Sequence, residues 1–66
     1  MEKGEQRIVT DIGLNRMFVH EPGTVIKITF IEGTLVGYTV DGALYFTTKI
    51  RIGKYSKPGS ISRQVV

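Results

Sequence analysis

The chain of 66 residues contains no cysteine, no tryptophan and a single histidine, His20. Without cysteine there is no disulfide, and one histidine cannot assemble a structural zinc site, so two usual supports of very small proteins are missing. A chain of this length buries only roughly 60% of its unfolded surface and forms one core. We therefore predict a single, marginally stable domain that gains apolar burial by forming a homo-oligomer.

Long apolar segments are missing as well. No apolar run approaches the roughly 20 residues of a membrane-spanning helix, and residues 1–7 contain no apolar stretch like that of a signal peptide. We expect no membrane partner. The absence of cysteine fits a reducing compartment, so we expect a cytoplasmic protein.

Side chains for catalysis are scarce. A nucleophilic triad would require His20 to meet a serine and a carboxylate, and nothing in their spacing indicates such a meeting. Glu32 and Asp41 lie at expected turns, where acidic residues are common for backbone reasons. Gly53-Lys54 lacks the remaining residues of a phosphate-binding loop. We predict no enzyme, no cofactor, no metal site and no small-molecule substrate.

The polar segment 1–7 has no hydrophobic periodicity, and we predict a flexible arm there, followed by one β domain over residues 8–66. Residues 8–12 fit a short strand with Ile8 and Ile12 directed inward. A short helix over residues 11–18, capped by Asp11, is the alternative. The sequence leaves this choice open.

Turn signals separate the following segments. Glu21-Pro22-Gly23 is typical of a chain reversal, Glu32-Gly33 of a tight turn, and Asp41-Gly42 of a type I′ hairpin. Between them we predict strands over residues 24–31, with Ile26, Ile28 and Phe30 inward, and over residues 34–40.

A longer alternating run covers residues 43–52. As a strand it places Leu44, Phe46, Thr48, Ile50 and Ile52 on a core face and Tyr45, Thr47, Lys49 and Arg51 on the opposite face. Residues 53–60 fit a loop, and residues 61–66 fit an edge strand. Four to six short strands joined by glycine-containing turns predict an all-β protein, either a small antiparallel sheet or a five-stranded SH3-like or OB-like barrel.

Charge is unevenly distributed along the chain. The net charge is +3, but residues 43–66 carry five basic and no acidic side chains, whereas residues 1–42 carry four basic and six acidic ones. Cations interleaved with aromatic rings suit single-stranded DNA or RNA, because bases stack on rings and phosphates pair with Lys or Arg. We predict non-specific nucleic-acid binding by Tyr45, Lys49, Arg51, Lys54, Tyr55, Lys57 and Arg63.

Two further interpretations stand beside this one. Polar and basic side chains are ordinary on the wet face of a half-buried sheet, where Lys also discourages edge-to-edge aggregation. Alternatively the chain is a protein-interaction or assembly module, such as a structural component or an inhibitor, that uses exposed strand edges and apolar patches. We expect Val19, Val36, Tyr38 and the segment 61–66 to contribute to such patches.

Residues 25–40 resemble the strand-glycine-strand-glycine opening of Sm and Hfq proteins. The interval from Gly33 to Gly37 is one residue shorter than in that family, and Asp41 comes early for its acidic position. The resemblance implies a ring-shaped oligomer that binds RNA. Because the shared residues are common ones, we do not assign the chain to the family.

Overall fold

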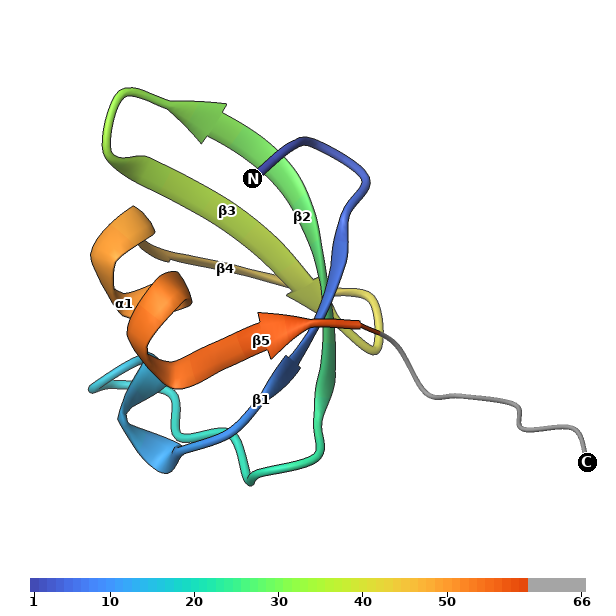
Figure 1. The fold of residues 1–66 in the computed structure, drawn as a ribbon, viewed down its shortest axis with the longest axis vertical. Coiled ribbons are helices and arrows are strands. Elements are labelled where there is room, and N and C mark those ends of the chain that lie inside the picture. The colour runs from blue at the N-terminus through green and yellow to red at the C-terminus, as the bar shows by residue number, and fades with distance from the viewer. Residues whose placement is uncertain (60–66) are drawn as a thin grey trace, which may run out of the picture.

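The computed structural model describes residues 1–59 of the chain (Figure 1). The elements in this part are β1 (Gln6–Val9), the 3-10 helix η1 (Ile12–Leu14), β2 (Val25–Glu32), β3 (Leu35–Val40), β4 (Ala43–Thr48), α1 (Lys49–Tyr55) and β5 (Ser56–Pro58). The strands form one antiparallel sheet in the order β4-β3-β2-β1-β5. The prediction of an all-β protein with a small antiparallel sheet is confirmed. In residues 1–59, β4 and β5 do not pair with each other, so the sheet is open and does not close into a barrel.

The three predicted turns are present. The amide of Thr24 donates a hydrogen bond to the carbonyl of Glu21 at 3.1 Å, which closes the reversal around Pro22-Gly23. Gly33 connects β2 to β3 with a φ of 62°. Asp41 and Gly42 have φ values of 51° and 85°, as a type I′ turn between β3 and β4 requires.

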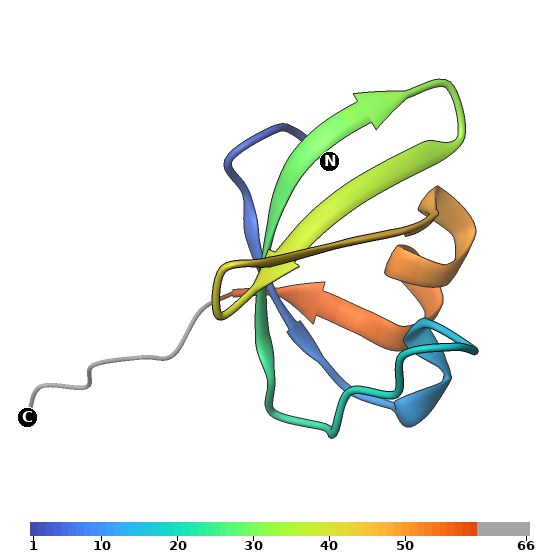
Figure 2. The same cartoon turned by 180° about the vertical axis from the view of Figure 1, so that it is seen from behind.

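The core lies on one side of the sheet. Its fully buried apolar side chains are Val9, Leu14, Ile26, Ile28, Val36, Tyr38 and Ile52. The helix α1 and the segment containing η1 lie on the same side of the molecule and contribute Ile52 and Leu14 to the core (Figures 1 and 2). The prediction that Val36 and Tyr38 remain exposed is therefore wrong.

The inward face of β2 changes within the strand. Ile26 and Ile28 are buried as predicted, but the pairing with β3 shifts between Ile28 and Phe30. Such a bulge reverses the faces of all residues that follow it. Ile31 consequently packs against the core, and Phe30 points away from it, which corrects the prediction for Phe30.

The predicted strand over residues 43–52 is wrong in length and in facing. The extended segment ends at Thr48, whose hydroxyl accepts a hydrogen bond from the amide of Arg51 and caps α1. In β4 the alternation runs opposite to the prediction: Thr47 is buried and Tyr45 half-buried, while Leu44, Phe46 and Thr48 are exposed. In α1, Ile52 is buried as predicted, but Ile50 is exposed.

The segment between residues 6 and 18 differs from both predicted alternatives, which were a strand over residues 8–12 and a helix over residues 11–18. Strand β1 begins at Gln6, so the last two residues of the predicted arm belong to the sheet, and Val9 is buried instead of Ile8. Of residues 11–18 only Ile12–Leu14 are helical, with Asp11 accepting a hydrogen bond from the amide of Gly13. Ile12 is exposed. The predicted edge strand over residues 61–66 lies outside the described residues.

Candidate functional site

The residues predicted to bind nucleic acid occupy different environments. Lys49 and Lys54 are exposed on α1, and Lys57 is exposed on β5. Arg63 lies outside the described residues. Residues 43–59 contain no carboxylate side chain, so these three lysines lie on an acid-free part of the chain.

The other predicted residues take part in packing. The guanidinium of Arg51 donates a hydrogen bond to the carbonyl of Gly13 at 3.1 Å and joins α1 to η1. Tyr55 packs against the core, and the Lys54 ammonium lies 5.4 Å from the centre of its ring. Tyr45 also packs against the core and stacks on Tyr38, with 5.6 Å between ring centres. The contribution of these residues to nucleic-acid binding stays a prediction.

A cluster of rings lies between β3, β4 and the segment that precedes β2. The Nε2 atom of His20 is 2.8 Å from the Tyr38 hydroxyl, and its ring packs edge-on against Tyr45 at 4.8 Å between centres. Phe18 contacts the same Tyr45 ring at 5.1 Å. Burial lowers the pKa of His20 below its usual 6.5 and raises the pKa of Tyr38 above its usual 10.0. Both groups are therefore neutral near pH 7, which suits a packed cluster.

Asn15 attaches the segment before β2 to the edge of the sheet. Its side-chain amide donates to the carbonyl of Phe46 in β4 at 2.9 Å, and its carbonyl oxygen accepts from the amides of Met17 and Phe18. The segment thus held carries three exposed apolar side chains, Met17, Phe18 and Val19. The prediction that Val19 is exposed is confirmed, and Asn15 also occupies one acceptor at the free edge of β4.

Arg7 is a buried arginine that the sequence prediction assigned to the arm. Its guanidinium donates to the hydroxyl of Ser56 at 2.8 Å, to the carbonyl of Ser56 and to a carboxylate oxygen of Glu5 at 2.9 Å. Burial acts to raise the pKa of Glu5, but hydrogen bonds from the Glu2 amide and from Arg7 outweigh it and lower the pKa. Because each partner is part of the fold, Arg7 is a structural group that joins β1 to β5.

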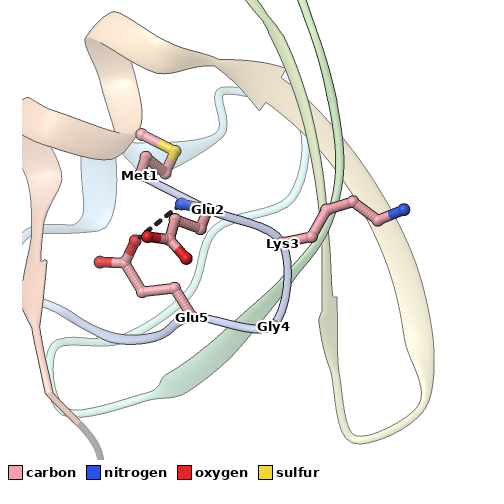
Figure 3. Close-up of a pocket in the computed structure, with 5 residues that line it drawn as sticks. All are labelled: Met1, Glu2, Lys3, Gly4 and Glu5. Atoms are coloured by element: carbon pink, nitrogen blue, oxygen red, sulfur yellow. Dashed lines mark hydrogen bonds between the residues drawn. The ribbon is translucent and has the colours of Figure 1, made fainter.

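The first residues of the chain line an open hollow (Figure 3). It is lined by Met1, Glu2, Lys3, Gly4 and Glu5, and a hydrogen bond from the Glu2 amide to the Glu5 carboxylate spans it. All its walls come from one short turn. Small-molecule sites are lined predominantly by apolar and aromatic side chains, whereas three of these five residues are charged.

The side of the sheet that faces away from the core is the most distinctive surface. We call its nine residues on β2, β3 and β4 the outer face; they are Lys27, Phe30, Glu32, Leu35, Gly37, Thr39, Leu44, Phe46 and Thr48. The strand register arranges them in three rows that cross the strands. The rows are Lys27-Thr39-Leu44, Phe30-Gly37-Phe46 and Glu32-Leu35-Thr48.

Four large apolar side chains on this outer face are open to solvent. Their exposed fractions are 37% for Phe30, 42% for Leu35, 48% for Phe46 and 55% for Leu44. Single exposed apolar residues are ordinary, but a contiguous group marks an interaction surface. The outer face therefore has the composition of a protein-binding surface.

Gly37 allows the two phenylalanines of the outer face to meet. Their rings form an edge-to-face pair with 6.0 Å between centres. A Cβ atom on Gly37 would lie 2.9 Å from the Cε1 atom of Phe46 and 3.0 Å from the Cβ atom of Phe30, closer than carbon atoms pack. The absent side chain thus places an aromatic pair at the centre of the face.

Two charged side chains flank this aromatic pair along β2. Lys27 lies in one outer row and Glu32 in the other, both exposed. Within residues 1–59 the ion pair is that between Glu5 and Arg7, and neither Lys27 nor Glu32 takes part in one.

Within residues 1–59 there is no group of three or more His, Cys, Asp or Glu side chains placed to hold a metal ion. No helix in the same part of the chain has the length and apolar character needed to cross a membrane.

Comparisons with known proteins find no match to this chain among protein-family models, curated proteins or solved structures.

Proposed function

We propose that the chain is a protein-interaction module that binds another protein surface through its outer face. The observation that carries this proposal is the cross-strand group Phe30, Leu35, Leu44 and Phe46, which is exposed on one face of the sheet. Aromatic residues at the centre of a patch with polar residues at its rim are typical of protein interfaces. The sequence-based version of this hypothesis used exposed strand edges and apolar patches, and the geometry favours an apolar patch on the face of the sheet.

The four apolar side chains of the outer face remain in contact with water in the isolated chain. Binding a partner would remove them from water and lower the free energy of the bound chain. Removing apolar surface from water contributes about 25 cal/mol per Å². The rest of the molecule does not cover these side chains in residues 1–59, although five apolar side chains of the same sheet are completely buried on its inner side. Coverage by a partner would therefore stabilise the bound chain.

Site-specific photocrosslinking in the cells of the source organism tests the proposal. A benzophenone amino acid replaces Leu44 on the outer face, and the matched variant carries it at Ile50, an exposed apolar residue on α1. We expect a discrete protein adduct from position 44 and none from position 50. Equal labelling at both positions, or no adduct at position 44, would contradict the proposal.

Nucleic-acid binding is the second candidate function. It is supported by Lys49, Lys54 and Lys57, which are exposed on a part of the chain without carboxylates. Fluorescence anisotropy with labelled single-stranded DNA and RNA measures it. We expect affinity that falls steeply with salt and weakens in the Lys49→Glu and Lys54→Glu variants but less in Lys3→Glu. Negligible binding at about 50 mM salt would rule this candidate out.

A further inference from the structure

The partner of the outer face can be specified from its charge pattern. We propose that the outer face binds a second copy of this chain, in a two-fold dimer whose symmetry axis follows the row Phe30-Gly37-Phe46. This inference rests on the proposed function, since it names the partner of the same surface. It is carried by the positions of Lys27 and Glu32 on either side of that row.

Symmetry decides which residues meet in such a dimer. Two sheets packed face to face can be related by a two-fold axis that lies between them. An axis along the central strand β3 would place Lys27 against the partner's Leu44 and Glu32 against the partner's Thr48, so that neither charge would meet an opposite charge. An axis across the strands reverses the strand direction, so Lys27 faces the partner's Glu32 and the pair occurs twice.

The axis across the strands also brings the apolar groups together. The middle row lies on the axis, so the aromatic pair Phe30–Phe46 of one protomer faces the same pair of the other. Leu35 lies opposite the partner's Thr39, and Leu44 lies opposite the partner's Thr48. The dimer therefore has aromatic rings at its centre and ion pairs at its rim, as stable interfaces do.

Partners that carry charge of a single sign match this face less well than a second copy of the chain does. The two charges have opposite signs and lie in the two rows that flank the central one, which gives a surface complementary to its own copy. A polyanion would be attracted to Lys27 but repelled by Glu32, and neither charge is compensated by an ion pair within residues 1–59. Charge complementarity thus favours self-association.

Sedimentation equilibrium of the full chain over a range of concentrations tests the dimer. We expect the mass to approach that of two chains as concentration rises. In the Lys27→Glu variant, two carboxylates face each other in each of the two pairs formed by positions 27 and 32. In the Glu32→Lys variant, two ammonium groups face each other in each pair. Because like charges across an interface cost several kcal/mol and 1.4 kcal/mol corresponds to tenfold, each variant should dimerise at least about tenfold more weakly.

Mixing the two single variants gives the decisive result. A Lys27→Glu protomer and a Glu32→Lys protomer place opposite charges against each other in both pairs, so we expect the mixture to dimerise more tightly than either variant alone. A variant that misfolds would not be rescued in this way. The control Lys54→Glu makes the same charge change on α1 and should leave the dimer unaffected.

The outcomes separate this inference from the proposed function. A monomer at all concentrations, or a dimer that the charge variants do not weaken, overturns the two-fold arrangement. If in addition position 44 crosslinks to a different protein, the interaction module stands and its partner is that protein. If position 44 gives no adduct and the chain is monomeric, both proposals fail. An adduct with the mass of two chains supports both.

Discussion

The Nε2 atom of His20 lies 2.8 Å from the hydroxyl oxygen of Tyr38, and both side chains are buried. Burial lowers the pKa of His20, so between that pKa and about 6.5 the unfolded chain binds more protons than the folded chain. The free energy of unfolding should consequently decrease as the pH falls from above 6.5 toward the pKa of the folded chain.

Urea unfolding at pH 7.5 and at pH 5.5 measures this dependence. The His20→Gln variant should lose most of it, although the variant itself is less stable at pH 7.5. Glu5, whose pKa is lowered from 4.5, contributes in the same direction only at lower pH. An unchanged pH dependence in His20→Gln would show that another group is responsible.

Two glycines should respond in opposite ways to replacement by alanine. At Gly37 the new Cβ atom would collide with Phe46 and Phe30, so Gly37→Ala should destabilise the chain by about 1–3 kcal/mol. At Gly53, in α1, no atom lies within 4 Å of the new Cβ atom, so Gly53→Ala should stabilise by up to about 1 kcal/mol. Thermal unfolding of both variants checks the contrast, and destabilisation by both would contradict it.

Arg7 should contribute more to stability than an exposed arginine does. Arg7→Met removes three hydrogen bonds that join β1 to Ser56 and Glu5, and we expect a loss of roughly 2–4 kcal/mol. The matched variant is Arg16→Met, since Arg16 is exposed, and it should change stability by less than about 0.5 kcal/mol. Denaturation midpoints in urea measure both, and equal effects would argue against the structural role of Arg7.

Variants of Asn15 should separate the two hydrogen-bonding roles of its side chain, which donates through its amide nitrogen and accepts through its oxygen. Asn15→Asp keeps an oxygen that accepts from the amides of Met17 and Phe18 but loses the donor to the carbonyl of Phe46. We expect those two amides to remain protected from hydrogen exchange in Asn15→Asp and to lose protection in Asn15→Ala. Both variants should be less stable by roughly 1–3 kcal/mol. Equal amide protection in the two variants would contradict the assignment.

The turns and the two hairpins could be predicted because their signals are local. Gly33, Asp41 and Gly42 adopt positive φ, which depends on a few adjacent residues and little on the rest of the chain. The faces of the strands were predicted less well, because one bulged residue or one shift in register exchanges the two faces. The bulge between Ile28 and Phe30 has no local signal in the sequence.

The candidate surface was only partly accessible from sequence. Alternation in residues 43–48 shows that two sets of side chains face opposite ways, but both sets contain apolar residues. Tyr45 and Thr47 face the core because they pair with the buried Tyr38 and Val36 of β3. Leu44 and Phe46 are consequently exposed, and the sequence-based assignment had the reverse.

By itself the sequence determined the class of fold, the positions of the turns and the absence of acidic groups from residues 43–66. The tertiary structure decided that Lys49–Tyr55 form a helix, that Arg7 is buried, and that four apolar side chains gather around Gly37 on the outer face. The physical reason is the range of the interactions. Turn geometry depends on neighbours along the chain, whereas burial and facing depend on partners that only the completed sheet brings together.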